Sequence, residues 1–281
     1  MSGSEFSEKS SFPVRRFPLL LLLACLGGCD TYHFVAGTWQ EDARKPAAAL
    51  KHYEKFLADR PKDPRSCEVR LRAAALYRGF GRCGEARRHW EAAVRDFPRS
   101  GACAERVKTS LLSCPDYFPL DLGRTWVYVD SESRGEAMRL EWEVRRSSGP
   151  SSGSIQTVLF AGSRRNREEF ESYEKRDWAV WRADAKPPEP FLRYPYGQDQ
   201  GWPGRRGGAA IDWLVISTTA TAKVAAGDFK DCLKVRELDR RYPKTWRYDY
   251  YCPDVGRVKT TIGGSGYENP NTELMRYGKM N

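Results

Sequence analysis

Histidine is scarce in this sequence, and its distribution excludes several kinds of catalytic site. The 281 residues include three histidines, His33, His52 and His89, so the chain after position 89 has none. A Ser-His-Asp or Cys-His arrangement therefore cannot form within that part of the chain. His52 and His89 occupy equivalent positions of an internal repeat, which indicates a packing role rather than a pair of ligands. We expect a protein that is not an enzyme.

Closely spaced cysteines and clustered charge are also lacking. None of the eight cysteines shows the C-x-x-C spacing of a zinc or redox site, so we expect no metal and no cofactor. The net charge is +10, but basic and acidic residues are interleaved along the chain. A nucleic-acid-binding protein would cluster its basic residues, so nucleic acid is not an expected partner.

A targeting segment opens the chain. Arg15 and Arg16 precede an apolar run of about ten residues, which is too short for a membrane-spanning helix. A basic segment followed by such a run is typical of a secretory signal peptide. The run ends in Leu26-Gly27-Gly28-Cys29, which resembles the bacterial lipobox. That resemblance implies a signal peptide over residues 1–28 and a diacylated Cys29 at the start of the mature chain.

The lipobox also implies a location. A protein anchored by the acyl chains of Cys29 would be held on a membrane of the bacterial cell envelope and would face the periplasm. Cys25, after Leu22-Leu23-Ala24, is a weaker competitor for this role. The sequence leaves open whether the inner or the outer membrane is involved. Six cysteines remain, and an even number in an exported chain predicts disulfide bonds.

An internal repeat predicts a helical domain over residues 41–114, after a lipidated linker over 29–40. With an offset of 37 residues, Ala49, His52, Tyr53, Glu54, Asp59 and Pro61 return as Ala86, His89, Trp90, Glu91, Asp96 and Pro98. This spacing of small, aromatic and proline residues resembles the second helix of a tetratricopeptide repeat (TPR), in the variant found in outer-membrane lipoproteins. Ala74 and Tyr77 fit the first helix.

The TPR resemblance implies one half repeat over 47–60, one full repeat over 67–98 and a final helix near 102–113. In this architecture the alanines allow close helix approach, the aromatic residues fill the space between helices, and the prolines end them. Cys67 and Cys103 would begin successive first helices, which stack side by side, with Cys83 and Cys114 past their other ends. The implied disulfides are Cys67–Cys103 and Cys83–Cys114.

Residues 115–281 predict an antiparallel β domain, which gives the chain an α+β fold class. Short stretches of alternating apolar and polar residues indicate strands near 124–130, 138–145, 155–161, 168–174, 178–183, 211–224, 229–239 and 245–252. The proline- and glycine-rich residues 186–208 are expected to form a loop, as are residues 262–266. Consecutive short strands of this kind favour a curled sheet or half-barrel.

The last two of these strands predict a hairpin with a definite register. A turn centred on Tyr242 places Cys232 opposite Cys252 and Glu237 opposite Arg247. A disulfide and an ion pair then follow from one register, and a shift by one residue would break both. We therefore predict the disulfide Cys232–Cys252.

Three segments of the β domain resemble TapB-like lipoprotein domains of unknown function. Residues 117–126, 224–235 and 250–259 are similar, in order and spacing, to the segments PL-x-x-G-x-x-W, V-x-A-G-x-F-x-x-C-x-x-V and YY-x-P-x-V-G-x-V. The resemblance implies an exported β domain and implies no reaction.

Together these features predict a non-enzymatic scaffold or assembly factor of the envelope, which binds a partner protein through its TPR segment. An alternative is a carrier whose curved β domain holds an apolar ligand or a glycan, with Trp202 of the 186–208 loop as an exposed contact residue. A hydrolase acting on envelope polymers is a third alternative, although no pair of convergent carboxylates can be identified from the sequence.

Overall fold

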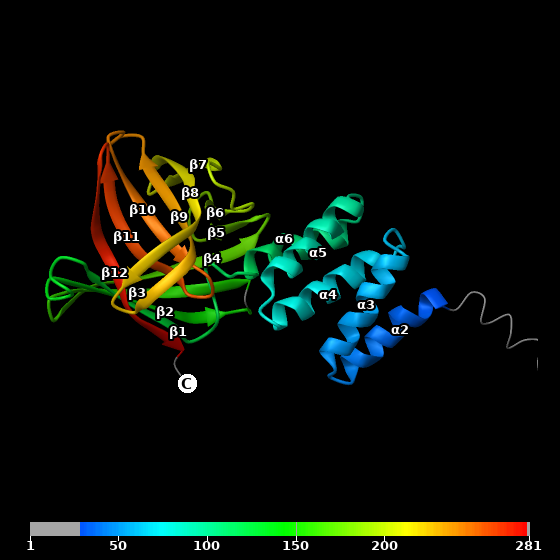
Figure 1. Cartoon of the computed structure of the whole chain (residues 1–281). Coiled ribbons are helices and arrows are strands. Elements are labelled where there is room, and N and C mark those ends of the chain that lie inside the picture. Colours follow the sequence, from blue (N-terminus) through cyan, green and yellow to red (C-terminus); the bar gives the residue numbers. More distant parts are fainter. Residues whose placement is uncertain (1–28, 150, 280–281) are drawn as a thin grey trace, which may run out of the picture. The chain divides into compact units, whose positions relative to one another are not determined.

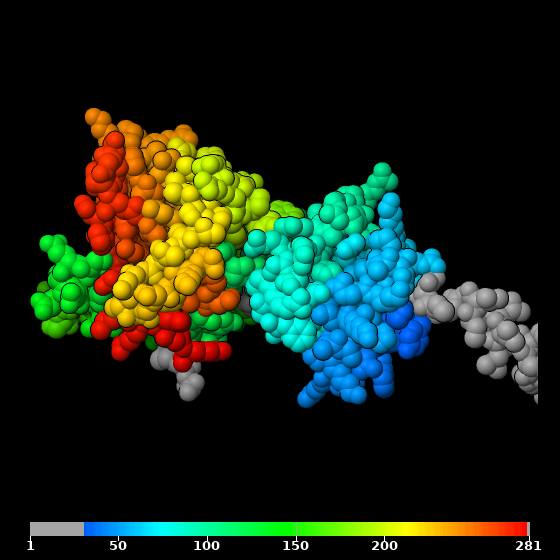
Figure 2. Space-filling model, in the orientation of Figure 1, coloured from blue at the N-terminus to red at the C-terminus, as the bar shows by residue number. Residues whose placement is uncertain are grey.

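The chain divides into two units, the first ending at Leu76 and the second beginning at Tyr77. The computed structural model describes residues 29–149 and 151–279, so the predicted signal peptide over 1–28 lies outside the described residues. The division falls within a helix, upstream of Cys114, where the sequence pattern changes from helical to β. Figure 1 labels the elements, and Figure 2 shows their surfaces in the same colours. None of the described helices is long and apolar enough to cross a membrane.

Helices make up the first unit: α2 (Cys29–Asp42), α3 (Pro46–Asp59) and most of α4 (Ser66–Gly79). The segment 29–40, predicted to be a linker, is therefore helical, and α2 packs along α3 (Figure 1). Gly37 permits this approach, because a Cβ at position 37 would collide with the ring of Tyr53. The Tyr53 hydroxyl also donates a hydrogen bond of 2.6 Å to Glu41 Oε2. A helical hairpin thus stands in place of the predicted half repeat.

The other helices lie where the repeat predicts them. They are α5 (Cys83–Asp96) and α6 (Gly101–Ser110), followed by a 3-10 turn at Leu111–Ser113. Helices α3 and α5 end shortly before Pro61 and Pro98, as expected of prolines that stop a helix. The small and aromatic positions of the repeat are buried, namely Ala49, Tyr53, Ala74, Tyr77, Ala86 and Trp90. These helices and their buried faces are confirmed, whereas membership of the TPR family stays a prediction.

A twelve-stranded antiparallel sheet dominates the second unit. Its strands are β1 (Arg124–Asp130), β2 (Met138–Ser147), β3 (Ser152–Ala161), β4 (Arg164–Arg176), β5 (Ala179–Arg182), β6 (Glu189–Arg193), β7 (Gly201–Arg206), β8 (Ala209–Val224), β9 (Gly227–Asp239), β10 (Thr245–Cys252), β11 (Gly256–Gly264) and β12 (Tyr267–Lys279). Each strand pairs with its neighbours in sequence, except that β1 pairs with β12 and β6 does not pair with β7. In Figure 1 the strands β8 to β12 (yellow to red) lie side by side along one wall.

The two edges of the sheet, β6 and β7, contact each other without forming a hydrogen-bonded ladder. Pro190 in β6 and Pro203 in β7 contribute to this gap, because proline has no N–H to donate to a neighbouring strand. The sheet is therefore nearly closed, which corrects the predicted half-barrel.

Two predicted loops contain strands. Residues 186–208 include β6 and β7, and residues 262–266 form the end of β11 and the turn into β12. The sequence did not predict these strands, because proline and glycine are rare within strands and interrupt the alternating pattern. In β11 the rings of Tyr248 and Tyr267 lie over Gly263 and Gly264, where a side chain would collide with them. The tyrosine rings fill the space that side chains at positions 263 and 264 would occupy.

The predicted hairpin register is confirmed. Strand β10 pairs with β9 so that Arg247 faces Glu237 and Tyr251 faces Leu233. Disulfides join Cys232 to Cys252 and Cys83 to Cys114, the pairs that the sequence predicts. Cys67 and Cys103 are disulfide-bonded as well, and their pairing with each other stays a prediction.

Candidate binding cavity within the curled sheet

A cavity of about 230 Å³ lies within the curled sheet of the second unit. Eight strands and the segment before β1 contribute its lining: Phe118, Trp142, Glu171, Tyr173, Arg182, Glu189, Phe191, Arg206, Trp213, Arg247, Tyr251 and Arg257. Half of these residues are aromatic and the other half are charged. Binding cavities of proteins are mostly apolar, with a few polar groups placed to orient a ligand. The many charged groups in this one indicate a polar ligand.

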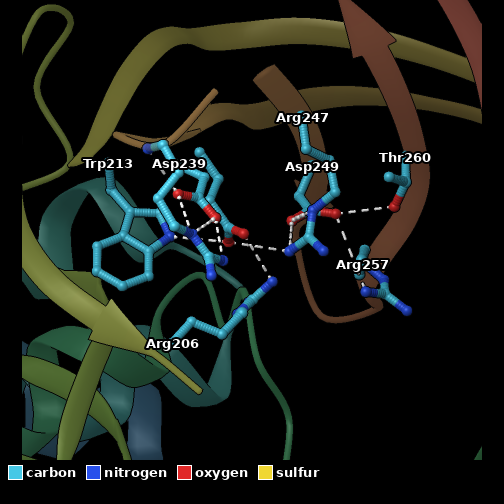
Figure 3. A network of polar contacts seen from close by, with 9 residues as sticks. Arg206, Trp213, Asp239, Arg247, Asp249, Arg257 and Thr260 are labelled. Carbon is cyan, nitrogen blue, oxygen red and sulfur yellow. Dashed lines mark hydrogen bonds and ion pairs between the residues drawn. The ribbon is translucent and has the colours of Figure 1, made fainter. Parts of the chain in front are cut away.

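The charged lining exists because β9 and β10 carry ionisable residues at alternate positions that face the core. Arg247, Asp249 and Tyr251 are at alternate positions of β10, so their side chains point to the same face of the sheet. Glu237 of β9 is paired with Arg247 on that face. Arg247 Nη2 lies 3.0 Å from Glu237 Oε2 and 2.8 Å from Asp249 Oδ2. Figure 3 shows Asp249 between Arg247 and Thr260, whose hydroxyl donates to Asp249 Oδ1 at 2.8 Å.

Glu237 ties two further cavity residues into this network. Arg206 Nη1 lies 2.8 Å from Glu237 Oε1, and the Trp213 indole donates to Glu237 Oε2 at 3.2 Å. A second group of ion pairs lies on β4 and β5. There Glu171 accepts a hydrogen bond of 2.8 Å from the Tyr173 hydroxyl and lies 3.4 Å from Arg182 Nη2. These contacts hold the lining side chains in defined positions.

The pKa shifts show which groups stay charged. Burial opposes ionisation of Asp249, but the charges of Arg247 and Arg257 outweigh it and lower the pKa of this carboxyl. Burial also opposes the charged form of Arg247, yet Asp249 and Glu237 raise its pKa. The pKa of Glu189 is raised by desolvation, which the charges of Arg182 and Arg206 partly offset. At neutral pH the network therefore keeps Asp249 and Arg247 ionised.

Four lining residues, Trp142, Arg182, Tyr251 and Arg257, have a hydrogen-bond donor that no described residue accepts from, and the last two lie side by side. Tyr251 is 4% exposed, and its hydroxyl forms no hydrogen bond with any residue that the structure describes. Arg257 lies opposite Tyr251 in the β10–β11 ladder, and its buried Nε has no partner among the described residues. Its guanidinium lies over the rings of Trp142 and Tyr128, at 4.2 and 4.8 Å from their centroids. The nearest carboxylate oxygen, Asp249 Oδ1, is 3.9 Å from its Nη1.

An unsatisfied buried donor such as Arg257 Nε is costly, so most such groups are paired with protein, water or a ligand. Tyr251 and Arg257 lie in the wall of one cavity and are partners across two strands. An oxygen atom or an anionic group that entered the cavity could therefore accept from both. The aromatic residues beside them offer flat apolar faces to the rest of a small ligand.

Trp202 corrects one expectation. The sequence predicts an exposed contact residue in a loop, but Trp202 lies in β7, is 3% exposed and does not line the cavity. Its ring stacks on Trp213 at 6.2 Å, so it supports a lining residue from behind. The charged residues of the cavity were not predicted as ligand-binding residues from the sequence. Their one signal is the hairpin register, which puts Glu237, Arg247 and Asp249 on the same face as Leu233 and Val235.

A larger hollow, of about 500 Å³, lies over β1, β2 and β3. Its carboxylates are ion-paired within their own strand, Glu141 with Arg139 at 3.0 Å and Glu143 with Arg145 at 2.9 Å. These surface pairs need no ligand, so we regard the smaller cavity as the better candidate site. No group of three metal-binding side chains occurs among the residues that the structure describes.

Comparisons with known proteins give two similar structures. One is a protein from Bacteroides fragilis described as exported and of YmcC-like fold, with a TM-score of 0.44 and 14% identity, covering 59% of this chain and 100% of that chain. The other, from Parabacteroides distasonis, is described as a lipoprotein, with a TM-score of 0.39 and 14% identity, covering 58% of this chain and 98% of that one. Neither a family model nor a curated protein matches the sequence, so the TPR and TapB-like resemblances stay predictions.

Proposed function

We propose that the protein is a lipid-anchored protein of the cell envelope whose β unit binds a small anionic ligand with a ring, such as an acidic sugar residue. The observation that carries this proposal is the pair of unused donors, Tyr251 and Arg257, in the wall of one cavity. A carboxylate or phosphate oxygen accepts strongly from a guanidinium and a phenol. The ring of the ligand would lie against Trp142 or Trp213.

The lining favours this ligand over an acyl chain. Six charged side chains face the cavity, and an acyl chain would remove water from them without replacing its hydrogen bonds. The volume, about 230 Å³, is below the range typical of drug-sized ligands and suits a single ring. Of the two ligand classes considered from the sequence, a glycan is therefore preferred to an apolar ligand.

The anchor and the helical segment complete the proposal. Lipidation of Cys29 is supported by the lipobox. A role for the helices in binding a partner protein is supported by the TPR-like repeat, whose alanine and aromatic positions are buried between helices as that architecture requires. In cells, Cys29→Ala should abolish acylation, so that an alkaline wash without detergent releases the exported protein from membranes. A mutant that only detergent released would place the anchor elsewhere.

Thermal unfolding of the purified mature chain tests the ligand class. Millimolar glucuronate or glucose 6-phosphate should raise the midpoint, whereas glucose and a fatty acid should not, because binding to the folded state alone stabilises it. Comparison of the midpoint shifts with glucuronate and with glucose 6-phosphate distinguishes a site for a carboxylate from a site for a phosphate. Equal shifts with glucose and glucuronate would contradict an anion site, and a shift with the fatty acid alone would favour the apolar carrier.

A further inference from the structure

An apolar stripe is exposed on α2, immediately after the predicted lipidation site. Tyr32, Val35 and Trp39 are 59%, 55% and 62% exposed. They follow one another at intervals of three and four residues, so they lie on one face of the helix. The opposite face is occupied, because Gly37 contacts Tyr53 of α3 and Phe34 lies 6.0 Å from Phe56. Within the first unit, Tyr32 meets the ring of His52 of α3 edge-on at 5.8 Å, and the side chains of Val35 and Trp39 have no ring contact or hydrogen bond with a described residue.

We propose that this stripe lies on the surface of the lipid bilayer that holds the protein, so that α2 is an interfacial helix. This inference rests on the proposed acylation of Cys29, which is the first residue of α2. At 1.5 Å per residue, Trp39 lies only about 15 Å along the helix from the acylated residue. The acyl chains therefore hold the whole stripe close to the membrane.

The residues of the stripe suit this position. Tyrosine and tryptophan are enriched at membrane–water interfaces, where an apolar ring and a polar group are both accommodated. Arg44 and Lys45 follow α2 and are exposed, so they can approach anionic head groups. With 14 residues, α2 is too short to cross a bilayer, so the proposal places it along the surface.

Surface contact of this kind would give the anchor a second attachment. Acyl chains fix a protein to the membrane but leave its orientation free. Insertion of Trp39 and Tyr32 at the head-group level would fix the rotation of α2 about its axis, because the stripe is on one face only. The face of α2 that packs on α3 would then point away from the membrane.

The test uses the mature chain with Cys29→Ser, which cannot be acylated, and vesicles of phosphatidylglycerol and phosphatidylcholine. The unacylated chain should float with these vesicles. Trp39→Ala should weaken this association by about tenfold, because the variant has no indole ring to transfer from water into the membrane interface. A matched control is Phe170→Ala in β4, where a similarly exposed ring (58%) should not affect flotation.

Several outcomes would overturn the inference. The first is failure of the unacylated chain to float, and the second is equal flotation of this chain with and without Trp39→Ala. The third is a concentration-dependent dimer of the unacylated chain that Trp39→Ala abolishes. The last result would identify a second copy of the chain as the occupant of the stripe. The mass of the N-terminal peptide of the exported protein tests acylation of Cys29 separately, so failure of the anchor and failure of the stripe can be distinguished.

Discussion

Tyr251 and Arg257 face each other across β10 and β11, and both line a cavity in which neither has a partner for all of its hydrogen-bond donors. Around them, Arg247, Asp249 and Glu237 satisfy one another. A structural ion-pair network accounts for the burial of Arg247, Asp249 and Glu237. It does not account for the unused hydrogen-bond donors of Tyr251 and Arg257.

Replacement of Tyr251 by phenylalanine separates ligand binding from stability. Its hydroxyl makes no hydrogen bond in the described structure, so Tyr251→Phe should leave the free energy of unfolding nearly unchanged. Binding of an acidic sugar should weaken by about tenfold, because one hydrogen bond to the anion is lost. Urea unfolding and calorimetric titration measure the two effects.

Tyr117→Phe is the matched control for this variant. Tyr117 is also buried, does not line the cavity, and donates to the Asp231 carbonyl at 3.2 Å. Its loss should reduce stability by about 1 kcal/mol and leave affinity unchanged. If Tyr251→Phe destabilised the protein and had no effect on binding, the phenol would have a structural role only.

Asp249→Asn should destabilise the protein by about 3 kcal/mol at neutral pH, because it leaves Arg247 with a weaker partner in a buried site. The effect should depend on pH. The pKa of Asp249 is lower in the folded state than its ordinary value, so its contribution to stability is present above that ordinary value and is lost as the pH falls through the folded-state pKa. The difference between wild type and variant should therefore be smaller at about pH 3 than at about pH 6. A difference independent of pH would mean that the charge of Asp249 is not what stabilises the fold.

A second buried ion pair joins the start of the β domain to β4. Lys175 Nζ lies 2.6 Å from Asp116 Oδ2, and the Lys175 side chain is fully buried. Lys175→Met should cost about 3 kcal/mol, because Asp116 then stays buried without its partner. Adding Asp116→Asn should recover part of this loss, and a double-mutant cycle in urea measures the coupling. Additive effects of the two substitutions would show that the pair is not coupled.

The role assigned to Trp202 can be tested in the same way. Because it is buried behind Trp213, Trp202→Ala should lower the free energy of unfolding by about 3–5 kcal/mol. Trp202→Phe keeps most of the packing and should bind the acidic sugar as wild type does. Loss of affinity in a stable Trp202→Phe variant would restore the ligand contact expected from the sequence.

The hairpin of β9 and β10 was predictable because two independent pairs demand one register. Cys232 with Cys252 and Glu237 with Arg247 agree only in that alignment. The strands β6 and β7 were not predictable, since Pro190 and Pro203 mark a segment as a loop unless it lies at the edge of a sheet. Helix α2 was missed because three of its large apolar residues, Tyr32, Val35 and Trp39, are exposed, which obscures the pattern of a single buried face.

The cavity was beyond sequence reasoning for a different reason. Tyr251 and Arg257 become partners through an irregularity in the β10–β11 ladder, between Tyr250 and Tyr251, which a simple alternation of faces does not reveal. The remaining lining residues come from strands far apart in the sequence, which only the curvature of the sheet brings together.

Calorimetric titration of the mature chain and its Arg257→Met variant with glucuronate, and with glucose as the neutral control, tests the central claim most directly. Methionine keeps the length and packing of the side chain and removes its charge and donors. We expect the wild-type protein to bind glucuronate and not glucose. The Arg257→Met variant should bind glucuronate at least about tenfold more weakly than the wild type. Binding of glucuronate that is equally strong in both proteins, or absent from both, would contradict an anion site in the cavity.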